Sequence, residues 1–202
     1  MPRPKSDAGP PADARMEAAL FAALRDMPFD RITVSGIVKG AGLNRNSFYY
    51  HFSDLDELAR SAVRRLLIPE IPRLIASGFR PDSDEFRQLL AEAAKRESLE
   101  RMLLVIGPHS TPKLRSMLQS AVTELWLESF GLTREHLGEE GCATMQFVLG
   151  GMFELLGGAD AAEVLDRLDA LRKLPVVQAC ADVMTDTFKA AASRAFEARM
   201  GR

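Results

Sequence analysis

Hydrophobic residues recur at intervals of three and four positions along most of this chain. That period places them on one face of an α-helix, and no segment shows the sustained period-two alternation of a half-buried strand. One helix opens with a capping box, in which Asp54 caps the N–H of Glu57 and Glu57 reaches back toward Asp54. The pattern predicts an all-α protein, with helices over about 16–27, 34–41, 44–52, 54–68, 83–95, 98–106, 112–130, 141–156, 161–174 and 175–199.

Two of these helices, both short and near the N-terminus, are joined by a glycine. From Val34, apolar residues recur at i, i+3, i+4 and i+7, and Thr33 is a suitable N-cap for that helix. Gly42 can end it at positive φ, because it has no Cβ. Asn44 caps the next helix, whose inward side carries two phenylalanines four residues apart. Two short helices around a tight turn predict a helix-turn-helix motif over residues 33–52.

The second helix of this motif concentrates hydrogen-bonding side chains. Both asparagines and both tyrosines of the chain fall within residues 44–50, and one of its three histidines follows. At about 100° per residue, Asn46, Ser47 and Tyr50 point most directly away from the core. The flanks carry Arg45, Tyr49 and His51. A polar helix start with two incidental aromatic residues has the same composition. Adjacent tyrosines on a solvent face favour a partner, however, and such side chains suit base edges and phosphates.

Residues Met16 to Val63 resemble the DNA-binding domain of the TetR family of transcriptional regulators. The most specific part is the run Ser-Phe-Tyr-Tyr-His-Phe at residues 47–52, because the family ends its recognition helix with a very similar pattern. The upstream helix, the glycine turn and the fourth helix lie at the offsets that the family has. The other matching positions are Phe29, Thr33-Val34, Ile37, Ala41-Gly42-Leu43 and Asp56-Glu57-Leu58.

The resemblance implies a fold and a set of DNA contacts. The fold is a three-helix helix-turn-helix DNA-binding domain over residues 13–68, joined to a larger helical ligand-binding and dimerisation domain over 69–202. One departure is Leu55, which stands where a phosphate-binding lysine is usual, so we expect weaker non-specific affinity. The implied contacts are phosphate or base contacts by Thr33 and Ser35, base contacts by Arg45, Asn46 and Ser47, a base-methyl or phosphate contact by Tyr49, and backbone contacts by Tyr50 and His51.

Composition sets broad limits on the protein. The net charge is −2; residues 1–68 carry ten Lys/Arg and eight Asp/Glu, and residues 69–202 carry sixteen and twenty. The asymmetry has the right sign for a DNA-binding N-terminus but is small. Residues 1–12 are rich in proline, glycine and charge, so we expect a disordered arm there. With no signal segment and no stretch of about 18 apolar residues, the sequence predicts a cytoplasmic protein without membrane contact.

Two helices in the C-terminal third indicate a homodimer. The segment 147–156 is apolar nearly all round, and such a helix must be covered on most sides. The last helix has apolar residues at mixed spacings of three and four. Two such helices meeting their copies across a two-fold axis would form a four-helix interface, as TetR-like dimers do. An ordinary monomer core is the alternative.

The resemblance also implies a small-molecule pocket among the middle helices. An apolar pocket with a few polar groups is the usual form of such a site. For each candidate residue, plain core packing is the alternative, because helical spacing cannot separate the two. The candidates are Phe86, Leu90, Met102, Ile106, Leu118, Val122, Trp126, Phe130, Met145 and Leu149.

Other chemistries find little support. His109, His136 and Cys142 do not share a metal-ligand spacing, and no nucleophile elbow or glycine-rich phosphate loop is present, so we expect no metal, no cofactor and no enzyme. The sequence predicts a DNA-binding transcriptional regulator, in this family most often a repressor. It would bind a palindromic double-stranded DNA operator as a homodimer and be released by a small apolar or amphipathic effector. The alternative is a dimeric small-molecule-binding or assembly protein of the same fold that has lost DNA binding, which Leu55 favours.

Overall fold

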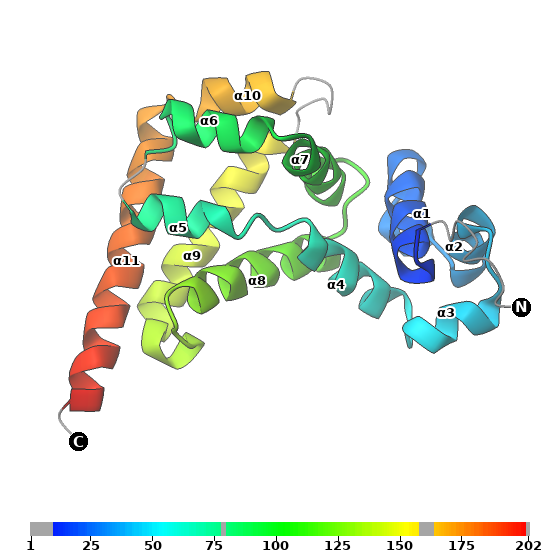
Figure 1. The fold of residues 1–202 in the computed structure, drawn as a ribbon, viewed down its shortest axis with the longest axis horizontal. Helices are drawn as coiled ribbons and strands as arrows, with labels where there is room; N and C mark the ends of the chain where they lie inside the picture. Colours follow the sequence, from blue (N-terminus) through cyan, green and yellow to red (C-terminus); the bar gives the residue numbers. More distant parts are fainter. Residues whose placement is uncertain (1–9, 78–79, 158–163, 201–202) are drawn as a thin grey trace, which may run out of the picture.

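The computed structural model describes residues 10–77, 80–157 and 164–200. Within these ranges the chain forms eleven α-helices and one 3₁₀ turn and contains no strand (Figure 1). The all-α prediction is confirmed. Of the arm expected over residues 1–12, residues 1–9 lie outside the described ranges, and Ala12 is already the first residue of a helix.

Four helices form the part of the molecule that we call the N-terminal unit. In Figure 1, α4 leads away from the other three. Met16, Phe48 and Leu58, one from each of three helices, are fully buried at its centre. These positions are apolar at helical spacing, so the sequence itself dictates which faces turn inward. The elements are α1 (Ala12–Asp26), the 3₁₀ turn η1 (Phe29–Arg31), α2 (Val34–Ala41), α3 (Arg45–His51) and α4 (Leu55–Arg65).

Seven helices form the remainder, which we call the helical body. The long helices α9 and α11 pack along each other, α8 lies against α4, and α6 lies beside α10 at one end (Figure 1). The elements are α5 (Glu70–Ala76), α6 (Asp84–Ala91), α7 (Ala93–Ile106), α8 (Pro112–Ser129), α9 (Arg134–Leu156), α10 (Val164–Leu171) and α11 (Pro175–Met200).

The structure corrects the helix boundaries between residues 83 and 106. Glu92 has extended backbone (φ −59°, ψ 134°) that ends α6 and begins α7, so the helix expected over 83–95 stops early and the next begins at Ala93. In one straight helix Leu90 and Leu99 would lie on opposite faces, at about 100° per residue. The break lets both enter the same core. No glycine or proline marks the position, so the sequence pattern does not reveal it.

Two further helices differ from the prediction. The sequence predicts no helix over residues 70–76, where the structure has α5. Pro69 is its N-cap, and Pro72 lies in its first turn, where a missing N–H leaves no helical bond unmade. The helix expected from residue 141 begins at Arg134, with a kink at Gly138 (φ 73°, ψ 178°). The expected start of the following helix, residue 161, lies outside the described residues.

The apolar core of the N-terminal unit continues into the helical body. Buried side chains of α1, α3 and α4 share one cluster with Ile106 of α7 and with Leu114 and Leu118 of α8. A second cluster joins the C-terminal half of α8 to α9 and α11. The apolar core therefore runs across the boundary expected near residue 68.

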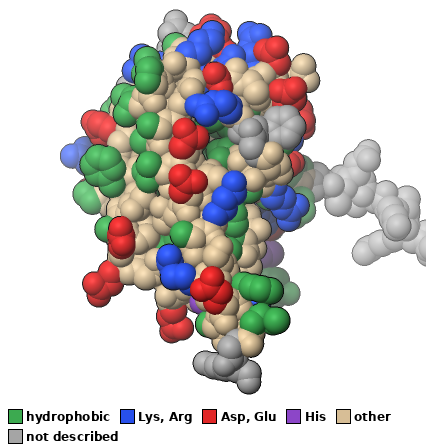
Figure 2. Space-filling view, turned by 90° about the vertical axis from the view of Figure 1, so that its left-hand side faces the viewer, with side chains coloured by type: hydrophobic (Ala, Val, Ile, Leu, Met, Phe, Trp, Pro, Cys, Tyr) green, Lys and Arg blue, Asp and Glu red, His purple; other side chains and the backbone are tan. Residues whose placement is uncertain are grey.

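Hydrophobic side chains remain exposed along α9 and α11, on the side of the molecule shown in Figure 2. Phe147 is 82% exposed on α9, and Val176 and Val183 are 58% and 47% exposed on α11. The three residues line one shallow groove together, which we call the α9/α11 face. None of the helices in the described ranges is long and apolar enough to cross a bilayer.

Candidate functional site

The helix-turn-helix has the local geometry that its sequence predicts. The hydroxyl of Thr33 accepts the N–H of Gly36 (3.1 Å) at the start of α2. Gly42 ends that helix in the left-handed region (φ 63°, ψ 39°). The Asn44 side chain then accepts the N–H of Ser47 (2.9 Å) at the start of α3. Both predicted caps and the glycine turn are confirmed, and they fix the angle between α2 and α3.

Arg15 of α1 holds the same turn from outside the motif. Its guanidinium donates to the carbonyls of Ala41 and Gly42, the latter at 3.1 Å. A Cβ at Gly42 would lie 2.9 Å from the Nη2 atom of Arg15, which can move aside, so the positive φ is what disfavours other residues in the turn. The partners are 26 and 27 positions apart, which is why the sequence pattern gives no sign of the contact.

The outward surface of α3 is a row of exposed polar and aromatic side chains. Phe48 is fully buried, whereas Tyr49 and Tyr50 are 56% and 86% exposed. The Tyr49 ring stands edge-on to Phe48, and the Tyr50 ring edge-on to His51. Such contacts limit ring motion without covering the rings. The exposed row, which we call the α3 ridge, consists of Arg45, Asn46, Tyr49, Tyr50 and His51.

Three other predicted DNA contacts differ in their surroundings. Ser47, expected to point outward, is half-buried, and its hydroxyl donates to the Asn44 side chain (3.2 Å). Thr33 and Ser35 are exposed at the start of α2, although the Thr33 oxygen already accepts the capping hydrogen bond. Leu55 is half-buried against the core, so no exposed side chain replaces the family's lysine at that position.

Residues 18–62 match the family model described as bacterial regulatory proteins, tetR family. Residues 18–62 therefore form a TetR-type DNA-binding domain. A comparison with curated proteins gave no match. The matched stretch contains the Gly42 turn and the whole α3 ridge, and it supports a DNA-binding transcription regulator.

The capping box at the start of α4 is shifted by one residue from the prediction. Asp54 accepts the N–H of Glu57 (2.8 Å), as expected. The Glu57 carboxylate reaches the N–H of Ser53 (2.6 Å), not that of Asp54. This hydrogen bond holds the pKa of Glu57 below its usual value. It also ties the end of the ridge to the helix that leads into the body of the regulator.

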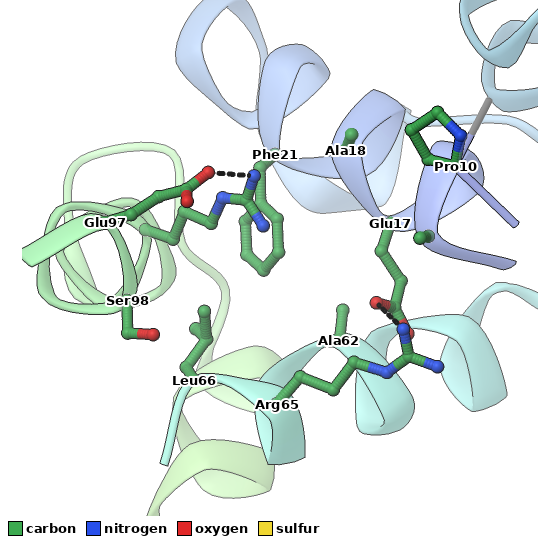
Figure 3. Close-up of a pocket in the computed structure, with 11 residues that line it drawn as sticks. Pro10, Glu17, Ala18, Phe21, Ala62, Arg65, Leu66, Glu97 and Ser98 are labelled. Carbon is green, nitrogen blue, oxygen red and sulfur yellow. Dashed lines mark hydrogen bonds and ion pairs between the residues drawn. The ribbon is translucent and has the colours of Figure 1, made fainter. Parts of the chain in front are cut away.

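In this regulator α1 meets α7 of the helical body through a charged and aromatic junction (Figure 3). The Arg101 guanidinium lies over the Phe21 ring, 5.2 Å from its centroid, and pairs with Glu97 (2.5 Å). Cation–π contacts of this kind are worth about 0.5–1 kcal/mol at exposed sites. Leu99 and Met102, on the same stretch of α7, face the interior of the body. One helix therefore contacts both α1 and the body's interior.

A buried carboxylate lies in the same junction (Figure 3). Glu17 of α1 is 4% exposed, accepts the Ser61 hydroxyl (2.8 Å) and pairs with Arg65 (3.2 Å). Burial raises the pKa of Glu17, and the hydrogen bond from Ser61 and the charge of Arg65 oppose that rise. Arg65 also pairs with Asp13 (2.5 Å), whose pKa it lowers. These groups fasten α1 to α4.

The helical body of the regulator encloses an apolar cavity of about 230 Å³. Leu118 and Met145 do not line it: they are 0% and 1% exposed and pack within the cores, and Ile106 and Phe130 also lie outside its lining. Helical spacing shows that such residues face inward but not whether they meet other atoms or a void. Six of the ten candidates line the cavity: Phe86, Leu90, Met102, Val122, Trp126 and Leu149.

The sequence pattern does not predict all of the residues that line the cavity. Ile71 and Ile75 come from α5, a helix that the sequence does not predict. Arg172 also lines the cavity, and a search for apolar positions cannot find it. Trp126 stacks on Phe130, with ring centroids 6.1 Å apart, which fixes the ring at the cavity wall.

Proposed function

We propose that this TetR-family regulator is a repressor that binds its operator as a homodimer and is released by an effector in the apolar cavity. The observation that carries the proposal is the α3 ridge, which projects from a helix whose position is fixed on both sides. Capping bonds and Arg15 hold it from the turn, and the buried Phe48 holds it from the core. A surface held this rigidly while exposing two tyrosines is suited to a partner.

The chemistry of the ridge suits double-stranded DNA. Asn46 can bond adenine through both of its amide atoms, and Arg45 can bond guanine or phosphate. Tyr50, the more exposed of the two tyrosines, has a ring for sugar or base-methyl contacts and a hydroxyl for phosphate. These are the roles that the TetR resemblance implies at the same positions.

A homodimer accounts for two features that one chain leaves unexplained. α3 is only seven residues long, so one copy reads few base pairs, whereas two copies about 34 Å apart read a palindrome. The α9/α11 face exposes Phe147, Val176 and Val183, and solvated monomers rarely leave such a group uncovered. We therefore place the two-fold axis at this face.

The helix α7 supports a coupling route between effector and DNA. Met102 lines the cavity, and Arg101 beside it contacts Phe21 of α1. An effector that displaces α7 also displaces α1 and with it the Arg15 contact to the turn. The two ridges of a dimer then no longer match successive major grooves, which lowers operator affinity.

A mobility-shift titration with DNA from the promoter region beside the gene tests the proposal. We expect a specific shift whose affinity falls steeply with salt, because neutralised phosphates release counterions. The competing function, a dimeric small-molecule-binding or assembly protein of the same fold without DNA binding, is favoured by the half-buried Leu55. Absence of any salt-dependent shift, with the protein folded and dimeric, would support that function and contradict ours.

A further inference from the structure

One charged side chain lies in the otherwise apolar wall of the cavity. Arg172, just after α10, is the only charged residue among the described residues that line it, and its side chain is 10% exposed. The other lining side chains are hydrocarbon, aromatic or sulfur-containing. A charge in such a wall is costly unless it is paired, so it calls for an explanation.

The partners of Arg172 leave part of its guanidinium available. Its Nε and Nη2 atoms donate to one oxygen of Asp169 (2.8 and 2.5 Å), and Nη1 donates to the Ser83 carbonyl (3.4 Å, a long contact). A guanidinium has five N–H groups, and these three bonds use three of them. The guanidinium can therefore donate to a further oxygen atom without losing its present hydrogen bonds.

Asp169 does not depend on Arg172 alone. Lys173 lies 2.7 Å from its other oxygen, and Arg87 lies 3.4 Å from the oxygen that Arg172 contacts. Hydrogen bonds from Lys173 and then Arg172 lower the pKa of Asp169 to about 2. Three cations thus surround the Asp169 carboxylate, and Asp84 and Asp166 line the neighbouring cleft. If Arg172 turns toward a second carboxylate, Asp169 keeps two partners.

Arg172 also stands between the cavity and the solvent. A cleft between α6 and α10 is lined by charged side chains of both signs: Asp84, Arg87, Asp166, Asp169 and Arg172. Leu90, Leu168 and Arg172 line both the cleft and the cavity. The two spaces share this wall, so Arg172 lies at the border between the cleft and the cavity.

We propose that the effector is an amphipathic carboxylate whose apolar body fills the cavity and whose anionic end is bound by Arg172. This inference rests on the proposed effector role of the cavity. The fork of the guanidinium matches a carboxylate, and charge-assisted bonds of this kind are about twice as strong as neutral ones. The cavity is below the range of about 300–1,000 Å³ usual for drug-sized ligands, so the acid is of medium length.

The test uses the fluorescence of Trp126, the only tryptophan of the chain and part of the cavity wall. The full-length protein is titrated with decanoate and with 1-decanol, which have the same chain and differ in charge. We expect both to change the emission, with decanoate at least tenfold tighter. Arg172→Met should weaken decanoate about 10- to 100-fold, the loss expected for a hydrogen bond to a charged group, and change 1-decanol less than about threefold.

Arg87→Met is the matched control, because Arg87 contacts the same carboxylate but does not line the cavity. It should leave decanoate affinity within about threefold of the wild type. If the wild type binds decanoate and 1-decanol with equal affinity, the proposed anionic end of the effector is wrong, whatever the variants show. The cavity then remains an apolar site. Binding of neither probe overturns both ideas. Decanoate binding that leaves the DNA shift unchanged supports the acid site and contradicts the effector role instead.

Discussion

The N-terminal unit and the cavity-bearing helical body are packed for different tasks. In the unit, Phe48 and Leu58 have no exposed surface, and every helix start of the helix-turn-helix is capped by a side chain. In the body, α6 and α7 are broken at Glu92, α9 is kinked at Gly138, and a void of about 230 Å³ remains. DNA reading requires side chains at fixed positions, whereas the effector binding that we propose requires space that other atoms do not fill.

The largest expected effect compares two leucines, one from each region. Leu58→Ala should lower the free energy of unfolding by about 4–5 kcal/mol, near the top of the range for such substitutions. Leu149→Ala should cost about 2–3 kcal/mol, because Leu149 already borders a void and loses fewer contacts. Urea unfolding at matched protein concentration measures both. Equal losses would contradict the difference in packing.

The second prediction concerns the α9/α11 face. Phe147→Asp should convert the homodimer to a monomer at micromolar concentration, because it places a charge where an apolar side chain would be covered. Sedimentation equilibrium measures the change. Met27→Asp is the control, since Met27 is an exposed apolar residue just after α1, far from that face in sequence. A wild type that is already monomeric would refute the dimer.

The third prediction separates recognition from stability. Asn46→Ala should weaken operator binding by about 1–3 kcal/mol and leave the free energy of unfolding within about 0.5 kcal/mol. Its effect should be smaller on unrelated DNA, because base contacts specify whereas phosphate contacts do not. Gln88→Ala, an exposed polar change on α6, should alter neither quantity. Equal losses on operator and unrelated DNA would argue against base reading by Asn46.

The smallest effect is a difference in pH dependence between the two regions. The raised pKa of Glu17 means that the wild type loses stability as pH rises above the ordinary value of 4.5, whereas Glu17→Gln does not. Asp169 behaves in the opposite way: its stabilisation is present above 3.8 and is lost as pH falls toward 2. Urea unfolding of the wild type and of Glu17→Gln across these two pH ranges tests the signs. A Glu17→Gln difference that is constant with pH would show that the carboxylate is not penalised by burial.

The helix-turn-helix is readable from the sequence because its determinants are local. Thr33 caps Gly36 and Asn44 caps Ser47, in each case three residues away, and Gly42 needs only its own backbone conformation. The orientation of Ser47 is the exception in this motif. Helical angles place the Ser47 side chain outward, but its hydroxyl donates back to the Asn44 side chain. A step of 100° per residue does not predict this hydrogen bond.

Contacts between distant parts of the chain are hidden from the sequence. Arg15 reaches a turn 26 residues away, and Arg101 covers Phe21 from a helix of the other region. Six pocket candidates line the cavity while Leu118 and Met145 do not, although all eight repeat at helical spacing. Periodicity reports which face turns inward, and packing alone decides whether that face meets atoms or a void.

The sequence by itself determined the helical class, the helix-turn-helix and the exposed reading surface, because capping and hydrophobic period act within a few residues. Only the tertiary structure decided the break at Glu92, the Arg15 contact and the place of Arg172 at the cavity wall. Each of these depends on segments that fold together from distant positions. Their geometry is set by how the helices fill space, which no local pattern of residues encodes.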